Sequence, residues 1–103
     1  MTQLIIRQKF STPVRRDEVE GDWDIRGFDC HSFSDPPGKE WNDFIHQTNE
    51  LLTVVVGQLE LTIENKTILV QPGDEVFILK GAIHSVKNCN NNHTNWLFGY
   101  YKP

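Results

Sequence analysis

The sequence predicts an all-β fold, either a sandwich of two sheets or a small barrel. Most of its 103 residues fall into short apolar or alternating segments, and turn-forming glycine, proline and asparagine residues separate these segments. Hydrophobic residues make up 38% of the chain and aromatic residues 11%, which is enough apolar material for one core. We therefore expect a single domain over residues 1–103.

The charge and the apolar pattern disfavour several classes of protein. The formal net charge is −4 and the cations are scattered, so neither a nucleic-acid partner nor a membrane surface is expected. No apolar run approaches the roughly 20 residues that cross a bilayer. Arg7 and Lys9 follow the first apolar residues instead of preceding them, which is the wrong order for a secretory signal. We expect a soluble cytoplasmic protein.

The first third of the chain contains two predicted strands and one segment with two interpretations. Leu4 opens a β-rich piece that ends near Phe10. Residues 13–20 fit a short helix, with Thr12 as its cap and a proline at its first position, or a loop, and the following glycine ends either one. Residues 23–30 alternate in character with one slip, which predicts a second strand containing a bulge.

The rest of the sequence is a succession of strands and tight turns. Residues 51–56 are continuously apolar, so both faces of this strand must be covered, whereas residues 59–64 alternate and leave one face to water. Residues 71–74 place proline and glycine where a type II turn requires them. Further strands are predicted at residues 42–46, 67–70, 75–79, 84–88 and 95–101.

Two histidines and a glutamate from separate segments form a candidate metal site. His46 and Glu50 stand four residues apart, and His84 comes from a second glycine-flanked segment downstream. Two imidazole nitrogens and one carboxylate are the minimum set of donors for a divalent metal ion.

The spacing around these residues resembles the two motifs of the cupin family. The first motif, G-x5-H-x-H-x3,4-E-x6-G, is matched in spacing by Gly38, Phe44, His46, Glu50 and Gly57. The second, G-x5-P-x-G-x2-H-x3-N, is matched by Gly73, Leu79, Gly81, His84 and Asn88. The resemblance covers roughly half of the chain and implies a double-stranded β-helix, the jelly-roll barrel, whose glycines serve the hairpin turns.

The resemblance also implies a ligand set. His46, Glu50 and His84 match metal-binding positions of the motifs, which implies one divalent ion per barrel, Fe, Mn, Ni or Zn. Phe44 stands where the family has a further histidine, and Leu79 replaces the proline of the second motif. Phenylalanine cannot coordinate, so three protein ligands would leave about three positions open on an octahedral metal.

Strand alternation extends this site into a predicted ligand pocket. If His46 points inward, Phe44 does too, and an inward Glu50 brings Leu52, Val54 and Val56 with it. A lone buried carboxylate in such apolar surroundings is costly, and a cation removes that cost. The last predicted strand places three aromatic side chains on the same face, Trp96, Phe98 and Tyr100. We expect this face to form one wall of the barrel. The pocket is therefore predicted to include Phe44, Val54, Trp96 and Phe98.

The residues that alternate with the inward-facing ones on the apolar strand predict that another element covers its outer face. Leu51, Thr53 and Val55 would face outward, and such a row requires either the N-terminal strand or a second subunit over it. Cupins commonly form homodimers, so the resemblance implies a homodimer.

Three functions are compatible with the sequence. The first is a metal-dependent enzyme of oxygenase or isomerase type that acts on a small oxygenated molecule. The second is a barrel that binds or senses a small ligand without turning it over. The third is a metal-free structural barrel, in which Phe44 fills the space beside a hydrogen-bonded polar cluster. No separate general base or arginine clamp stands out, so the catalytic residues, and whether the protein is an enzyme, stay open.

Overall fold

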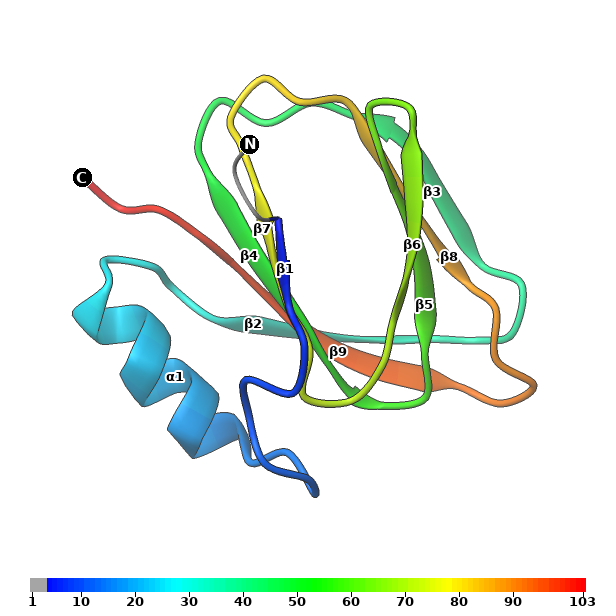
Figure 1. Ribbon diagram of the computed structural model, residues 1–103, viewed down its shortest axis with the longest axis horizontal. Coiled ribbons are helices and arrows are strands. Elements are labelled where there is room, and N and C mark those ends of the chain that lie inside the picture. The colour runs from blue at the N-terminus through cyan, green and yellow to red at the C-terminus, as the bar shows by residue number, and fades with distance from the viewer. Residues whose placement is uncertain (1–3) are drawn as a thin grey trace.

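The computed structural model describes residues 4–103, which form two antiparallel sheets that face each other and one helix (Figure 1). The first sheet contains, in spatial order, β1 (Ile5–Ile6), β7 (Glu75–Ile78), β4 (Glu50–Val56), β9 (Thr94–Tyr100) and β2 (His31–Asp35). The second contains β3 (Glu40–Phe44), β8 (His84–Asn88), β5 (Leu59–Ile63) and β6 (Lys66–Val70). The predicted all-β jelly-roll barrel is confirmed.

The main core lies between the two sheets. Alternation on β5 buries Leu59, Leu61 and Ile63 and leaves Glu60 exposed, as expected for a strand with one wet face. Across the barrel, Leu52 and Val54 of β4 are fully buried in the same cluster. These inward-facing residues form the apolar core of the barrel, next to the candidate site.

Two glycines show why the sequence turns where it does. Gly57 has a φ of +98° at the end of β4, and a Cβ there would collide with Thr94. Gly73 has a φ of +90° in the predicted type II turn, where the Asp74 amide donates to the Gln71 carbonyl at 3.0 Å. A side chain is unfavourable at both positions because L-residues rarely adopt this backbone conformation.

The N-terminal third differs from its prediction. The helix α1 spans Arg16–Ile25, so it begins after residue 13 and continues through Gly21. Its N-cap is Arg15, which makes no side-chain capping bond, whereas Thr12 was the predicted cap. The predicted strand over residues 23–30 was wrong, because the helix buries Val19 and Trp23, four residues apart, on one face. The β-rich piece predicted to reach Phe10 is limited to β1 within the described residues.

The helix covers the outer face of the first sheet (Figure 1). Val19 and Trp23 pack in a second core cluster with Leu51 and Leu97 of that sheet. Of the row predicted to need a cover, Leu51 packs with the helix residues rather than with the N-terminal strand, Thr53 is buried and Val55 is half-buried. The homodimer stays a prediction.

Val56 is another correction. Its side chain is 55% exposed, although the parity of Glu50 predicted an inward position. The register between β4 and β9 shifts between Val54 and Val56, and this irregularity turns the end of the strand outward.

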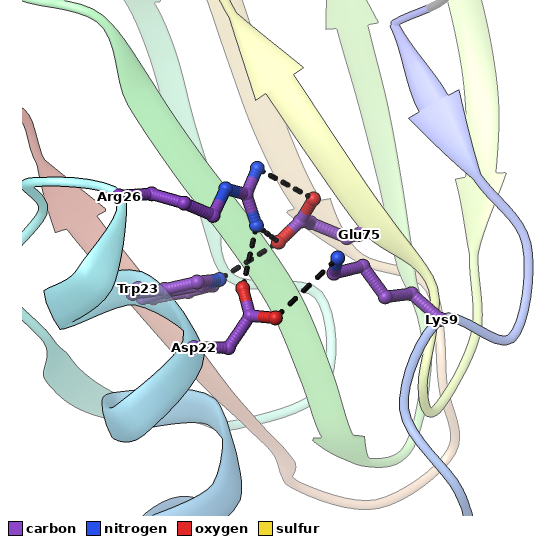
Figure 2. A network of polar contacts seen from close by, with 5 residues as sticks. All are labelled: Lys9, Asp22, Trp23, Arg26 and Glu75. Atoms are coloured by element: carbon purple, nitrogen blue, oxygen red, sulfur yellow. Dashed lines mark hydrogen bonds and ion pairs between the residues drawn. The ribbon is translucent and has the colours of Figure 1, made fainter.

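A buried carboxylate fixes the helix to the sheet. Figure 2 shows the Glu75 carboxylate, which accepts the indole N–H of Trp23 at 2.8 Å and two guanidinium contacts from Arg26 at 2.7 and 3.1 Å. Arg26 also contacts Asp22 at 2.6 Å, and Asp22 lies 3.5 Å from Lys9. Glu75 is 2% exposed, so these donors compensate the loss of its hydration.

Replacing Arg26 by methionine is expected to lower the free energy of unfolding by about 2 kcal/mol, because Glu75 would keep only the Trp23 donor. The partial exposure of Arg26 keeps this figure below that of a fully buried pair. Urea denaturation measures the effect, and Arg16→Met is the matched control, since its pair with Glu20 is exposed. Equal losses in both variants would contradict a role for the buried contact.

No helix within residues 4–103 has the length and apolar character needed to cross a membrane.

Candidate metal centre and ligand cavity

A cavity of about 170 Å³ lies between the two sheets, and its wall is mainly aromatic. The lining residues come from both sheets and from the loop after β3: Phe33, Trp41, Phe44, His46, Glu50, His84, Val86, Trp96, Phe98 and Tyr100. Phe33 of β2 stacks on Trp41 of β3, with ring centroids 5.6 Å apart, and so links the first sheet to the second. Within this wall, the polar atoms of His46 and His84 lie beside the Glu50 carboxylate.

The structure brings the three predicted metal ligands together in this cavity. Oε1 of Glu50 lies 3.5 Å from Nε2 of His46 and 3.4 Å from Nε2 of His84. One donor atom from each of the three residues lies within 4.8 Å of the others. They form the one such cluster of histidine, cysteine and acidic side chains found in residues 4–103.

Each donor is positioned by a different part of the fold. Glu50 is the first residue of β4 and His84 the first of β8, so the two sheets bring them together at one end of the barrel. The backbone carbonyl of His46, in the loop after β3, accepts the amide of Gly81 at 2.9 Å. Nδ1 of His84 lies 3.1 Å from the Ala82 carbonyl, which leaves Nε2 free to face Glu50.

The charged groups of this cluster are buried, and burial makes an unpaired charge unfavourable. Glu50 and His84 are each 4% exposed, and Oε1 of Glu50 is buried without a hydrogen-bond partner in the described chain. Burial disfavours the charged form of His84, but the Glu50 carboxylate 3.4 Å away and the Ala82 carbonyl outweigh it and raise the pKa of His84. An orphaned carboxylate oxygen beside two imidazole nitrogens is an arrangement that a cation would stabilise.

The donor spacing fits a divalent cation. Metal–ligand bonds near 2.1 Å hold neighbouring donor atoms about 3.0 to 3.4 Å apart in octahedral or tetrahedral geometry. The two separations from Glu50, 3.5 and 3.4 Å, are close to this range. The mixed nitrogen and oxygen donors suit zinc and the first-row transition metals better than calcium or magnesium.

Tyr100 is a polar member of the site that sequence reasoning treated only as part of an aromatic wall. Its hydroxyl lies 3.5 Å from Nε2 of His46, and its ring contacts the His46 ring edge-on at 4.9 Å. Burial, with the nearby charges of Glu50 and Asp29, raises the pKa of Tyr100 to about 12. The alternation of residues along β9 predicted that the Tyr100 side chain points into the barrel, but it could not predict how close the hydroxyl lies to His46.

Asp35 is a second residue that the sequence did not single out. Its buried carboxylate accepts the indole N–H groups of Trp41 and Trp96, each at 3.0 Å. These tryptophans belong to opposite sheets and both line the cavity. Asp35 therefore holds the two tryptophan walls of the cavity in place. From the sequence, Asp35 and the two prolines that follow it predicted only a turn.

Three of the four predicted pocket residues line the cavity: Phe44, Trp96 and Phe98. Val54 does not, because it is fully buried in the main core. The Phe44 ring lies 6.0 Å from the His46 ring and 6.3 Å from the His84 ring, measured between centroids. It therefore stands beside both histidines, where the resemblance placed the missing ligand.

Several solved structures share this fold. A conserved protein of unknown function from Streptococcus pyogenes aligns with a TM-score of 0.67 and 22% identity over 75% of this chain and 66% of that one. A cupin 2 domain-containing protein from Halorhodospira halophila gives a TM-score of 0.69 and 22% identity over 75% and 53%. A chain from the crystal structures of the DMSP lyases RdDddP and RnDddQII gives 0.66 and 20% over 73% and 38%.

These likenesses show the fold alone, because the identities are low. The chain spans less than two thirds of the length of each of these three structures. No curated protein matches the chain. A protein-family model described as "Cupin domain" matches residues 32–100, which include both predicted motifs from Gly38 onward. With two thirds of its length matched, the chain belongs to the cupin family.

Proposed function

We propose that this cupin holds one divalent metal ion through His46, Glu50 and His84 and binds a small oxygen-containing molecule against it. The observation that carries the proposal is the buried Oε1 of Glu50, which has no hydrogen-bond partner in the described chain and lies within 3.5 Å of two imidazole nitrogens. A cation at this point would satisfy all three groups at once.

The cavity lining supports a particular kind of ligand. Its walls are aromatic or aliphatic apart from the three donors, the Tyr100 hydroxyl and the indole N–H groups, which Asp35 already engages. No lysine or arginine is among the described lining residues, so apart from the two histidines they offer no basic side chain to an anionic ligand oxygen. These features favour a ligand with an apolar or aromatic body and one or two oxygens directed at Glu50 and the histidines.

When bound, the metal supplies a Lewis acid that polarises a ligand oxygen. The chain's own residues would position that oxygen, because the imidazoles and Glu50 form the polar part of the cavity wall and aromatic rings form most of the remainder. Lyase, oxygenase or isomerase chemistry would all begin from this arrangement.

Binding without turnover is the second candidate function. Beyond Glu50, His46, His84 and Tyr100, the described lining residues provide no further acid or base. A reaction that needs a separate proton carrier would therefore have to use Tyr100, one of the three donors or the ligand itself. This favours a binding or sensing barrel over a proton-transfer enzyme.

Metal analysis tests the proposal. Protein purified without chelator is expected to contain roughly one divalent ion per chain, and Glu50→Gln is expected to lose it, because the neutral amide keeps the shape but not the charge. Glu60→Gln, on the exposed face of β5, is the matched control. The metal-free cluster would be the better account if the wild type took up no Zn, Fe, Mn or Ni in titrations, or if Glu50→Gln bound metal as tightly as the wild type.

A further inference from the structure

Two oxygen atoms in the cavity lack good partners and face the same histidine. One is Oε1 of Glu50, which is buried without a hydrogen bond in the described chain. The other is the Tyr100 hydroxyl, whose contact with Nε2 of His46 is 3.5 Å long, at the far limit of a hydrogen bond. Polar groups in a half-buried site normally find closer partners, so both oxygens indicate a shared partner between them.

The fold holds these groups side by side. Glu50 and Tyr100 are directly paired across β4 and β9, the two strands with the longest shared ladder of the first sheet. Their neighbours Leu52 and Phe98 continue the same inward row. The Tyr100 ring meets the His46 ring edge-on at 4.9 Å, and its hydroxyl lies 3.5 Å from Nε2 of His46, the same nitrogen that lies 3.5 Å from Glu50.

We propose that the Tyr100 oxygen is a fourth protein ligand of the metal, supplying the donor that Phe44 cannot. This inference rests on the metal site proposed above. Three of the six donor–donor separations, Tyr100 to His46, His46 to Glu50 and Glu50 to His84, are 3.4 to 3.5 Å. A four-coordinate cation with bonds near 2.1 Å separates its ligands by about 3.4 Å.

The chemistry of the step is simple. On metal binding, the Tyr100 oxygen would donate an electron pair to the cation, and its hydroxyl proton would pass to water. The donor set would become two nitrogens and two oxygens, and the Tyr100 oxygen would come from the first sheet, whereas Phe44 belongs to the second. The open face of the metal is then narrower than three ligands would leave it, which selects ligands that bind through a single oxygen.

Zinc affinity is the first measurement. Competition against a coloured chelator should show binding at least about tenfold weaker in Tyr100→Phe than in the wild type. Tyr101→Phe is the matched control, since Tyr101 is 44% exposed and packs on Phe28 outside the cavity. Circular dichroism establishes that both variants keep the fold. Equal affinity in all three proteins overturns the inference.

Loading the protein with ferric iron distinguishes direct coordination by Tyr100 from an indirect effect in which Tyr100 only positions His46. Ferric iron bound by a tyrosine oxygen absorbs visible light by charge transfer, whereas imidazole and carboxylate ligands alone give no such band. The wild type and Tyr101→Phe should be coloured when loaded with ferric iron, and Tyr100→Phe colourless. Weaker zinc binding in Tyr100→Phe without a visible band in the iron-loaded wild type also overturns the inference. A wild type that binds neither metal overturns the proposed metal site, and this inference with it.

Discussion

Replacing Trp23 by alanine is expected to destabilise the protein by about 4 kcal/mol, the largest stability effect of any change considered. The indole is fully buried between helix α1 and the first sheet, in the cluster that contains Leu51 and Leu97. Its removal leaves a cavity that backbone elements on both sides prevent from closing. It also removes the N–H that Glu75 accepts at 2.8 Å, so part of the compensation for that buried charge is lost.

Chemical denaturation, followed by far-ultraviolet circular dichroism, measures this effect. Ile25→Ala is the matched control because Ile25 lies on the same helix with its side chain 88% exposed, and its loss should change stability by less than about 0.5 kcal/mol. A Trp23→Ala variant that unfolds at the same denaturant concentration as Ile25→Ala would show that the helix does not stabilise the barrel.

Restoring the missing histidine, Phe44→His, is expected to tighten zinc binding by at least about tenfold. The present ring lies beside both His46 and His84, so an imidazole in its place would bring a nitrogen to the same cluster. Removing a donor by His84→Ala should weaken binding by about a hundredfold or more, because Glu50 then loses its closest imidazole. Isothermal titration with zinc measures both changes.

Phe33→His is the control for this pair of variants. It adds a histidine to the same cavity wall, but the ring contacts of Phe33 within the described chain are with Trp41, Trp96 and Phe98, and not with either donor histidine. A gain in affinity as large as that of Phe44→His would mean that any extra imidazole suffices. Unchanged affinity in both Phe44→His and His84→Ala would contradict the site itself.

The barrel was predictable from the sequence because its turns and buried strand faces depend on local residue preferences. Gly57 and Gly73 mark positions where backbone sterics exclude most side chains, and the alternation of β5 gives its buried face directly. The end of β4 was not predictable in the same way. Val56 follows the parity of Val54 in the sequence, but a register shift, which depends on the neighbouring strand, turns it to solvent.

The helix was misplaced because its apolar residues also suit strands. Trp23 and Ile25 alternate like strand residues, and aromatic and β-branched side chains favour sheets. Tertiary packing decides otherwise: Val19 and Trp23 share one helical face and bury it, while Ile25 points to solvent. A four-residue spacing in so short a segment did not outweigh the local preferences.

The candidate donors were predictable from spacing, but their polar neighbours were not. His46, Glu50 and His84 match a motif, whereas Tyr100 and Asp35 acquire their roles from distances across strands. Whether the three donors hold a metal is a question of affinity, and the experiments above measure it directly.

The three tryptophans divide the protein into two optically separate regions. Trp41 and Trp96 line the cavity and share one carboxylate acceptor, whereas Trp23 lies in the cluster beneath the helix. A Trp23→Phe protein would therefore have tryptophan fluorescence from the cavity alone, while a protein with only Trp23 would report the docking of the helix. Ligand screening and folding kinetics can each be followed without an added dye.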